Sequence, residues 1–330
     1  MFNKIQPFFL IAVTPAHVGS GSELGLVDLP LQREKTTGYP KIEASSLKGC
    51  IREAFENSIA TEKKEPNSSE NNKINEEIVD IIFGPEDSDE SFASAVIFTD
   101  AKILFFPVKS LKGTFAWITC PFVLKRFENE IKDIYKNEKF KLDEIVVNSI
   151  NEKSSNILNG DKIVLEEYTF QVTKKNDLLN NLTNLINDCS VNDKIKKDIV
   201  VLSDDDFKHF VLTSTEVITR TKIDNITGTV KSGSLWTEEY LPAYTIMYAF
   251  AFETKIHLTK EKLEEFNKKS QKKLNETNNN DFINTIFSKN KIIQIGGNRT
   301  IGKGFFKINL LNNTCITNNT NDKKEVQNAK

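Results

Sequence analysis

A histidine, a glycine-rich turn and a carboxylate lie within one short segment near the start of the chain. His17 opens the run His17-Val18-Gly19-Ser20-Gly21, and Asp28 follows a few residues later. An imidazole can transfer a proton, and a carboxylate can accept one or hold a hydrated divalent cation. The apolar run over residues 8–13 predicts a buried strand that delivers this segment to the surface, where functional sites are usually built.

A second glycine-rich loop lies near the other end of the chain, at residues 296–304. It comes one residue short of a nucleotide-binding P-loop, because Gly304 follows Gly302 and Lys303 where a serine or threonine would hold Mg²⁺. The next segment has the composition of a strand, whereas a P-loop leads into a helix. We therefore exclude an NTPase. Both glycine loops could let a nucleic-acid backbone approach main-chain N–H groups closely.

The charge balance limits how the chain could bind nucleic acid. The formal net charge is −2 and the pI is about 6.1, so contact with RNA or DNA would need local basic patches. Lys48 and Arg52 are four residues apart in a helix predicted to begin after an N-cap at Ser46. Such a pair could hold a phosphate, although two solvated cations on a surface helix explain the same spacing.

The cysteine and histidine content excludes several classes of protein. The four cysteines are far apart without a CxxC pair, and with only three histidines a structural zinc site is not expected. Scattered, unpaired cysteines suit a reducing cytoplasm. The run at residues 8–13 is too short for a signal peptide or a membrane span. We therefore expect a soluble cytoplasmic protein without membrane contact.

Helices and strands mix without the regular alternation of a βαβ protein, which favours an α+β fold. Residues 61–77 are polar and predict a mobile linker or an insertion, and residues 136–192 show no clear pattern. The other predicted elements are helices at 46–55, 122–135, 204–210 and 260–273, and strands at 92–108 (paired around a turn at 99–102), 113–119, 241–252, 291–295 and 305–311.

Residues 220–233 form an arm of extended character. Alternating β-forming residues surround a turn at Gly228, and the arm carries Arg220, Lys222 and Lys231 but few large apolar side chains. Such an arm could project from the body and touch a negatively charged partner. An ordinary amphipathic hairpin explains the pattern equally well.

Six motifs occur along the chain in a fixed order. They are His17-Val18-Gly19-Ser20-Gly21, Val27-Asp28-Leu29-Pro30, Ser45-Ser46-Leu47-Lys48-Gly49, Ile223-Asp224-Asn225-x-Thr227-Gly228-Thr229-Val230, Glu238-Glu239-Tyr240-Leu241-Pro242 and the loop at 296–304. Together they resemble the RAMP superfamily and, within it, the backbone subunits of type III-B CRISPR (Cmr) effector complexes. Each motif alone is weak, but the ordered set is specific.

The resemblance implies a fold and a domain organisation. It predicts a ferredoxin-like (RRM-like) palm with an extended β-hairpin thumb at about residues 216–240, all within a single domain over residues 1–311. An insertion at about 56–90 and a variable region at about 136–204 would interrupt the palm. Residues 312–330 would form a disordered tail.

The resemblance also implies an activity. Several copies would stack along a guide CRISPR RNA with the other subunits of an effector complex, and each thumb would displace a nucleotide pair of the guide–target duplex. The single-stranded target RNA would be cut beside each displaced position, with weakly bound Mg²⁺ or Mn²⁺. Asp28 corresponds to the essential carboxylate, which would either accept the 2′-hydroxyl proton or anchor the metal ion. His17, Glu238 and Tyr240 match positions around the cut site.

The implied RNA contacts form a narrow track, which suffices for a near-neutral subunit because guide–target pairing reads the sequence. They are Lys48, Arg52, Gly19, Gly21, Arg220, Lys222, Lys231, Gly296, Gly297, Arg299, Gly302 and Lys303. Attack by the RNA 2′-hydroxyl would leave a 2′,3′-cyclic phosphate and a 5′-hydroxyl.

Two alternatives remain open on the sequence. One is a non-catalytic, guide-binding filament subunit in which Asp28 is a loop residue. The other is a guide-processing RAMP endoribonuclease that acts alone. The sequence also leaves open whether Glu238 or Glu239 faces the cut site.

Overall fold

The computed structural model describes residues 2–23, 25–61, 69–86, 92–137, 140–142, 145–151, 156–176, 182, 198–270, 273–276 and 280–311. Its helices are α1 (Ala44–Thr61), α2 (Ser69–Phe83), α3 (Pro121–Asp133), α5 (Asp204–Thr213), α6 (Lys260–Ser270) and α7 (Phe282–Lys289), with a 3₁₀ turn η1 (Arg299–Ile301). Its strands are β1 (Lys4–Ala12), β2 (Lys41–Ile42), β3 (Val96–Phe98), β4 (Ala101–Lys109), β5 (Phe115–Thr119), β6 (Ser149–Asn151), β7 (Lys162–Leu165), β8 (Tyr168–Gln171), β9 (Lys174–Asn176), β10 (Ile199–Val201), β11 (Glu216–Ile223), β12 (Val230–Tyr240), β13 (Ile246–Glu253), β14 (Ile292–Gln294) and β15 (Phe305–Leu310).

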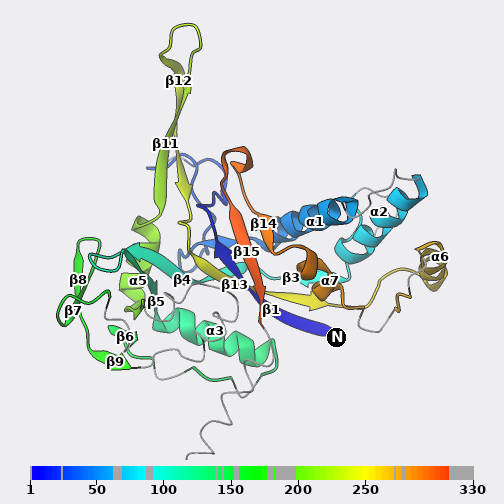
Figure 1. The fold of residues 1–330 in the computed structure, drawn as a ribbon, viewed down its shortest axis with the longest axis horizontal. Helices are drawn as coiled ribbons and strands as arrows, with labels where there is room; N and C mark the ends of the chain where they lie inside the picture. Colours follow the sequence, from blue (N-terminus) through cyan, green and yellow to red (C-terminus); the bar gives the residue numbers. More distant parts are fainter. Residues whose placement is uncertain are drawn as a thin grey trace, which may run out of the picture.

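Most of the strands belong to one mixed sheet (Figure 1). The strand order is β14-β15-β1-β13-β4-β5-β10-β6-β9, with β2 paired to β4 and β3 paired to β13. The strands β7 and β8 form one separate hairpin, and β11 and β12 form another. The combination of a large sheet with helices confirms the predicted α+β class.

Helices cover both faces of this sheet. Neighbouring side chains on a strand point to opposite faces. In β1, the ring of Phe8 lies 5.0 Å from that of Phe287 in α7, whereas the ring of Phe9 lies 6.1 Å from that of Phe127 in α3. Because both faces are covered, every residue of β13 is buried, and apart from Glu253 at its end its sequence is a continuous apolar run rather than an alternating one.

The apolar spacing correctly predicts α3, where Val123, Leu124, Phe127 and Ile131 form one buried face behind a proline at the first turn. The predicted strands at residues 8–13, 113–119, 291–295 and 305–311 are also present with small changes at their ends. Strong periodicity or a run of β-branched and aromatic residues was the signal in each case.

Three predictions about α1, α2 and the following strands were wrong. The helix α1 begins at Ala44, before the proposed cap Ser46. Residues 61–77 were predicted to be a mobile linker or an insertion; the linker alternative is wrong for residues 69–77, which belong to α2, whose buried Ile78, Val79 and Ile82 have helical spacing. The strands β3 and β4 do not pair with each other around their turn, because each pairs with β13.

Several elements were not predicted at all, among them α7 and the short strands between residues 149 and 201. Parts of the predicted insertion at 56–90 and of the variable region at 136–204 lie outside the described residues, as does the tail at 312–330. The division of the chain into domains therefore stays a prediction.

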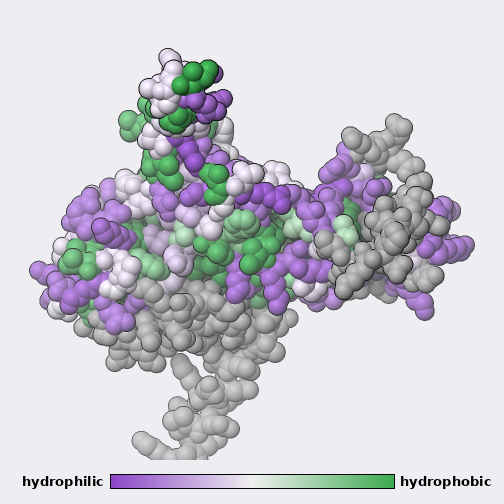
Figure 2. Space-filling view, turned by 45° about the horizontal axis from the view of Figure 1, so that its top comes forward, coloured by the Kyte–Doolittle hydropathy of each residue, from purple (hydrophilic) through white to green (hydrophobic). Residues whose placement is uncertain are grey.

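The hairpin of β11 and β12 projects from the body, as expected for the thumb (Figure 1). Its turn is held by Asp224, whose Oδ1 accepts the backbone N–H groups of Ile226 at 2.8 Å and Thr227 at 3.0 Å. The hairpin as a whole exposes several large apolar side chains, and green patches lie among its polar neighbours in Figure 2. These side chains are Val217, Ile223, Ile226, Val230 and Leu235.

Within the part of the chain that the structure describes, no helix combines the length and apolar character needed to cross a bilayer.

Candidate functional site

At the base of the hairpin, the first glycine turn and the segment around Asp28 lie beside β12, which is about 200 residues away in the sequence. Gly19 forms an antiparallel bridge with Leu31, and Leu29 forms a parallel bridge with Glu238 of β12. The backbone of Leu29 donates to Thr237 at 3.0 Å and accepts from Glu239 at 3.0 Å. The segment that carries Asp28 is therefore held between the first glycine turn and β12.

Asp28 is exposed, and one of its carboxylate oxygens is bound by a β12 residue. Thr237 donates to Oδ2 from its backbone N–H at 2.7 Å and from its hydroxyl at 2.9 Å. The same hydroxyl accepts the backbone N–H of Asp28 at 2.9 Å. The hydrogen bonds from Thr237 favour the ionised carboxylate and lower the pKa of Asp28. The other oxygen, Oδ1, has no hydrogen-bond partner among the described residues.

Glu238 lies at the centre of a buried polar cluster at the base of the hairpin, formed by Glu238, Tyr240, Arg220, Trp236 and Asn298. Its Oε2 accepts from Arg220 Nε at 3.0 Å, from Asn298 Nδ2 at 2.9 Å and from the Tyr240 hydroxyl. Its Oε1 accepts from Trp236 Nε1 at 2.8 Å. The Tyr240 hydroxyl also accepts from Arg220 at 2.6 Å and from Asn298 at 2.8 Å. We call this set the Glu238 cluster.

The Glu238 cluster keeps its carboxylate ionised and its phenol neutral. Burial opposes ionisation of Glu238, but the hydrogen bonds from Tyr240, Trp236 and Arg220 outweigh it, so that the pKa of Glu238 is lowered. Burial and the hydrogen bond to Glu238 raise the pKa of Tyr240. Glu238 and Tyr240 are 6% and 0% exposed, so both act on other protein groups rather than facing solvent.

His17 packs against the Glu238 cluster, with its ring 5.5 Å from that of Tyr240. Its Nδ1 lies 2.7 Å from the backbone oxygen of Glu239. Because a carbonyl oxygen can only accept, Nδ1 carries a proton and donates to it. A Cβ on Gly19 would come within 2.7 Å of the His17 Nε2, so the glycine leaves room for the imidazole.

The structure brings together three of the four predicted catalytic residues and separates the fourth. Side chains alternate along a strand, so Glu238 and Tyr240 project from the face of β12 opposite to that of Thr237, which holds Asp28. His17 is hydrogen-bonded to Glu239 and Asp28 to Thr237, positions two residues apart on β12, or roughly 7 Å at the usual strand rise. No hydrogen bond among the described residues joins Asp28 to the other three.

Glu239 is a structural residue that the sequence did not distinguish from Glu238. Its Oε2 accepts the backbone N–H of Leu31 at 2.9 Å, and its Oε1 accepts from Thr215 at 2.7 Å and from Arg33. Arg33 in turn donates to the backbone oxygens of Gly38 and Val211, each at 3.0 Å. Glu239 therefore fixes the Asp28-bearing segment, and both of its carboxylate oxygens are bound by protein groups.

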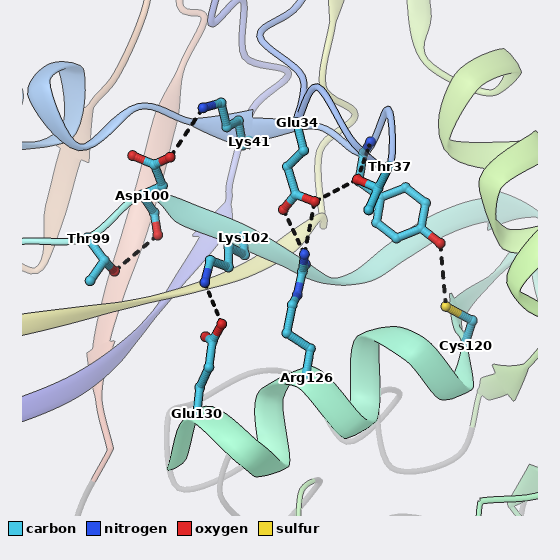
Figure 3. A network of polar contacts seen from close by, with 10 residues as sticks. Glu34, Thr37, Lys41, Thr99, Asp100, Lys102, Cys120, Arg126 and Glu130 are labelled. Atoms are coloured by element: carbon cyan, nitrogen blue, oxygen red, sulfur yellow. Dashed lines mark hydrogen bonds and ion pairs between the residues drawn. The ribbon is translucent and has the colours of Figure 1, made fainter. Parts of the chain in front are cut away.

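A polar network continues this anchoring into the body (Figure 3). Arg126 of α3 donates to both carboxylate oxygens of Glu34, at 2.8 and 2.9 Å, and Thr37 donates to Glu34 at 2.6 Å. On the same helix, Glu130 pairs with Lys102 of β4. Each of these partly buried charged groups is paired with a group of opposite charge. The segment that follows Asp28 is therefore fixed to α3 and the central sheet.

The second glycine loop needs its glycines mainly for packing. A Cβ on Gly296, which has a φ of +86°, would lie 2.2 Å from the backbone oxygen of His17, and Gly297 donates to that oxygen at 2.9 Å. Open space surrounds only Gly21 and Gly302 among the five glycines predicted to approach RNA. Asn298 of this loop, which joins the Glu238 cluster, was missed because a lone asparagine in a loop carries no signal of its own.

The predicted phosphate site on α1 is occupied by protein groups. Asp100 accepts the first backbone N–H of α1, from Ala44, at 2.9 Å, so this helix start already holds an anion. Arg52 pairs with Glu56 at 2.8 Å and with Asp80 at 3.0 Å, and is therefore part of the packing between α1 and α2. Lys48 is half-buried and donates to Ser94 at 2.8 Å; burial lowers its pKa.

The remaining predicted RNA-binding cations differ in how far protein groups already engage them. Arg220 and Arg299 pair with Glu238 and Glu53, respectively, so their charge is partly neutralised. Lys303 lies over the Tyr240 ring at 4.8 Å, a cation–π contact that keeps it beside the hairpin base. Lys222 and Lys231 are exposed along the hairpin, with no ion pair to any residue in the described ranges.

The described residues contain no group of three histidine, cysteine, aspartate or glutamate side chains placed to hold a metal. Asp28 is the one predicted ligand, and its exposed Oδ1 fits a cation that keeps most of its waters. The donor set thus suits a weakly held, hydrated Mg²⁺ or Mn²⁺ and does not suit a dehydrated structural ion.

Comparison with known proteins identifies the family of this chain. The sequence model of the RAMP superfamily matches residues 9–307, which is most of the chain. The chain belongs to the RAMP superfamily. Within this superfamily, it is 37% identical over 323 residues to the "CRISPR system Cmr endoribonuclease Cmr4" of Pyrococcus furiosus, with 94% of this chain and 96% of that protein covered.

Three further comparisons agree. The "CRISPR system CMR subunit Cmr4" of Saccharolobus solfataricus is 25% identical and covers 94% of this chain and 98% of its own length. The crystal structure of oligomeric Cmr4 from Pyrococcus furiosus has a TM-score of 0.63 at 29% identity, covering 93% of this chain and 98% of that one. A chain in the cryo-EM structure of a type III-B Cmr-beta complex bound to cognate target RNA has a TM-score of 0.69 at 22% identity, which supports the fold.

Proposed function

We propose that this protein is a backbone subunit of a type III-B CRISPR effector complex that binds guide RNA and cleaves complementary target RNA at regular intervals. One structural observation carries the proposal: Asp28 presents an exposed, ionised carboxylate at the base of a projecting hairpin and is held there by a residue of that hairpin. The relative from Pyrococcus furiosus is named an endoribonuclease, and related solved chains are oligomeric or part of RNA-bound complexes.

The chemistry requires little from the protein, because RNA carries its own nucleophile. The 2′-hydroxyl must be aligned with the phosphorus, and the charge that develops in the transition state must be stabilised. A hairpin that displaces a nucleotide pair would bend the target strand beside its base, where Asp28 lies. Cleavage would therefore recur once per subunit along the guide.

Asp28 is the residue we assign to the reaction itself. Its lowered pKa makes it a weak base, which favours an electrostatic role over proton abstraction. Its Oδ1 would hold a hydrated Mg²⁺ or Mn²⁺, which would supply positive charge to the phosphate. His17, Glu238 and Tyr240, predicted beside the cut site, would act mainly by fixing the hairpin base against the second glycine loop.

The RNA track would follow the cations that remain available. Lys222 and Lys231 on the hairpin and Lys303 at its base are the strongest candidates. Lys48, Arg52 and Arg299 would contribute less, because protein partners already occupy them. Additional copies of the subunit would extend the track. A cytoplasmic location remains a prediction.

The proposal is tested with the reconstituted, guide-loaded complex and a labelled complementary RNA in the presence of Mg²⁺. The unmodified protein is expected to give regularly spaced products that end in a 2′,3′-cyclic phosphate, and Asp28→Ala is expected to lower the rate by about 100-fold or more with target binding intact. A 5′-phosphate on the downstream product would rule out attack by the 2′-hydroxyl.

One observation favours a non-catalytic scaffold as the second candidate. The hydrogen bonds between Asp28 and Thr237 also stabilise a turn, which is a sufficient structural role for the aspartate. Cleavage that is unchanged in Asp28→Ala, or absent from the unmodified complex, would leave guide binding as the function. Processing of guide precursors by the isolated chain would instead support the guide-processing alternative.

A further inference from the structure

We infer that Thr237 is the positioning residue for Asp28, and that through it the hairpin strand β12 sets the geometry of the cut site. This inference rests on the proposed nuclease function. It concerns a residue outside the predicted cut site, whose role follows only from contacts between segments far apart in the sequence.

The contact between the two residues is reciprocal. The Thr237 hydroxyl donates to Asp28 Oδ2 at 2.9 Å and accepts the Asp28 backbone N–H at 2.9 Å, while the Thr237 backbone N–H donates to the same Oδ2 at 2.7 Å. One side chain thus fixes both the main chain and the carboxylate of Asp28. With Oδ2 held twice, the rotation of the carboxylate is restricted and Oδ1 points away from Thr237.

The surrounding backbone makes this arrangement specific to position 237. Leu29, next to Asp28, donates to the Thr237 carbonyl at 3.0 Å and accepts from Glu239 at 3.0 Å. The adjacent Glu238 and Glu239 are committed to the Glu238 cluster and to the Arg33 contact. Only Thr237 lies on the correct face of β12, at the correct register, to reach the Asp28 side chain.

The consequence is mechanical. The strand β12 runs from the hairpin turn to the site, so an RNA that repositions the hairpin also repositions the residue that holds Asp28. Misplacing a reacting group by about 1 Å can cost about 100-fold in rate. Thr237 therefore links engagement of the hairpin to the competence of the carboxylate.

The test compares Thr237→Val and Thr237→Ser in the reconstituted complex. Valine keeps the size and β-branching of threonine but removes the hydroxyl, and serine keeps the hydroxyl. Under single-turnover conditions, Thr237→Val is expected to lower the cleavage rate by about 10- to 100-fold with unchanged affinity for target RNA, as for residues that orient a ligating group. Thr237→Ser is expected to restore most of the rate.

Thr219→Val is the matched control, because Thr219 is exposed and lies directly opposite Thr237 in the hairpin register.

A second readout is independent of cleavage. The readout is a double-mutant cycle in thermal unfolding. Thr237→Val should lower the melting temperature of the unmodified protein by more than it lowers the melting temperature of the Asp28→Ala variant. Additive shifts would refute the contact.

The possible failures are distinguishable. Cleavage that is unaffected by Thr237→Val, or equally lost in the valine, serine and control variants, overturns the role of Thr237 while leaving the nuclease function standing. Absence of cleavage from the unmodified complex rejects the proposed function, and with it any catalytic consequence of this contact.

Discussion

At the scale of single residues, the hydrogen bonds of the buried Glu238 carboxylate fix the geometry of the hairpin base. The Glu238 carboxylate accepts hydrogen bonds from four different residues, and Tyr240 shares two of those donors. Removing one partner of such a set leaves the others buried and unsatisfied, which costs more than the hydrogen bond itself contributed. We therefore expect substitutions here to act first on stability and only then on activity.

Glu238→Gln gives a pH-dependent test of this expectation. The folded pKa of Glu238 lies below its ordinary value of 4.5, so its ionised form stabilises the fold at pH values above 4.5 and this contribution is lost as the pH falls through the folded pKa. At pH 7 the free energy of unfolding of the variant should be lower than that of the unmodified protein by about 1–3 kcal/mol. The difference from the unmodified protein should shrink below pH 4.5.

Urea unfolding between pH 7 and pH 3 measures this difference. Glu261→Gln is a suitable control, because Glu261 is exposed on α6. A pH-independent gap between Glu238→Gln and the unmodified protein would contradict an ionised Glu238.

At the scale of elements, the second glycine loop and the segment around Asp28 are held by close contacts to backbone atoms of other segments. Gly296 packs against the His17 carbonyl, and Glu239 binds the backbone of Leu31. Neither contact involves an element of regular secondary structure on both sides. Loops that position functional groups in this way depend on fixed partners rather than on their own propensity.

Gly296→Ala should destabilise the loop strongly. The alanine Cβ would lie 2.2 Å from the His17 oxygen at a left-handed φ of +86°, so strain and overlap add, and we expect a loss of about 3 kcal/mol or more. Gly302→Ala is the matched comparison. It has a similar φ of +78° in open space and should cost about 1–2 kcal/mol. Equal losses in chemical denaturation would show that the close contact is not present.

At the scale of the whole molecule, binding to RNA has to be reconciled with a net charge of −2. Most of the arginines near the site are already paired within the protein, whereas Lys222 and Lys231 project on the hairpin. A local track suffices if several copies share one guide. The chain covers 96% and 98% of the length of the two Cmr4 relatives it matches.

The double variant Lys222→Ala/Lys231→Ala should bind single-stranded guide RNA more weakly and with less dependence on salt. Each lost phosphate contact makes the negative slope of log affinity against log salt shallower by about 0.7. A decrease of about 1.4 in the size of the slope is therefore expected for the pair. Filter binding across a salt series measures the slope, with Lys208→Ala on α5 as an exposed control. An equal change in the control, or a weaker affinity with an unchanged slope, would argue against direct phosphate contacts.

The sequence by itself determined the α+β class, the strand at residues 8–13, α3 and the ordered motifs of the family, because each is encoded by local spacing or by residues adjacent in the chain. That the hairpin projects was implied only by the family resemblance, since local spacing fits an ordinary hairpin equally well. Only the tertiary structure decided what the individual site residues do. Asp80 neutralises Arg52, Asn298 completes the Glu238 cluster, and Thr237 holds Asp28 on the other face of β12. These partners are separated by long stretches of sequence, so their pairing depends on the packing of the folded chain, which no local pattern records.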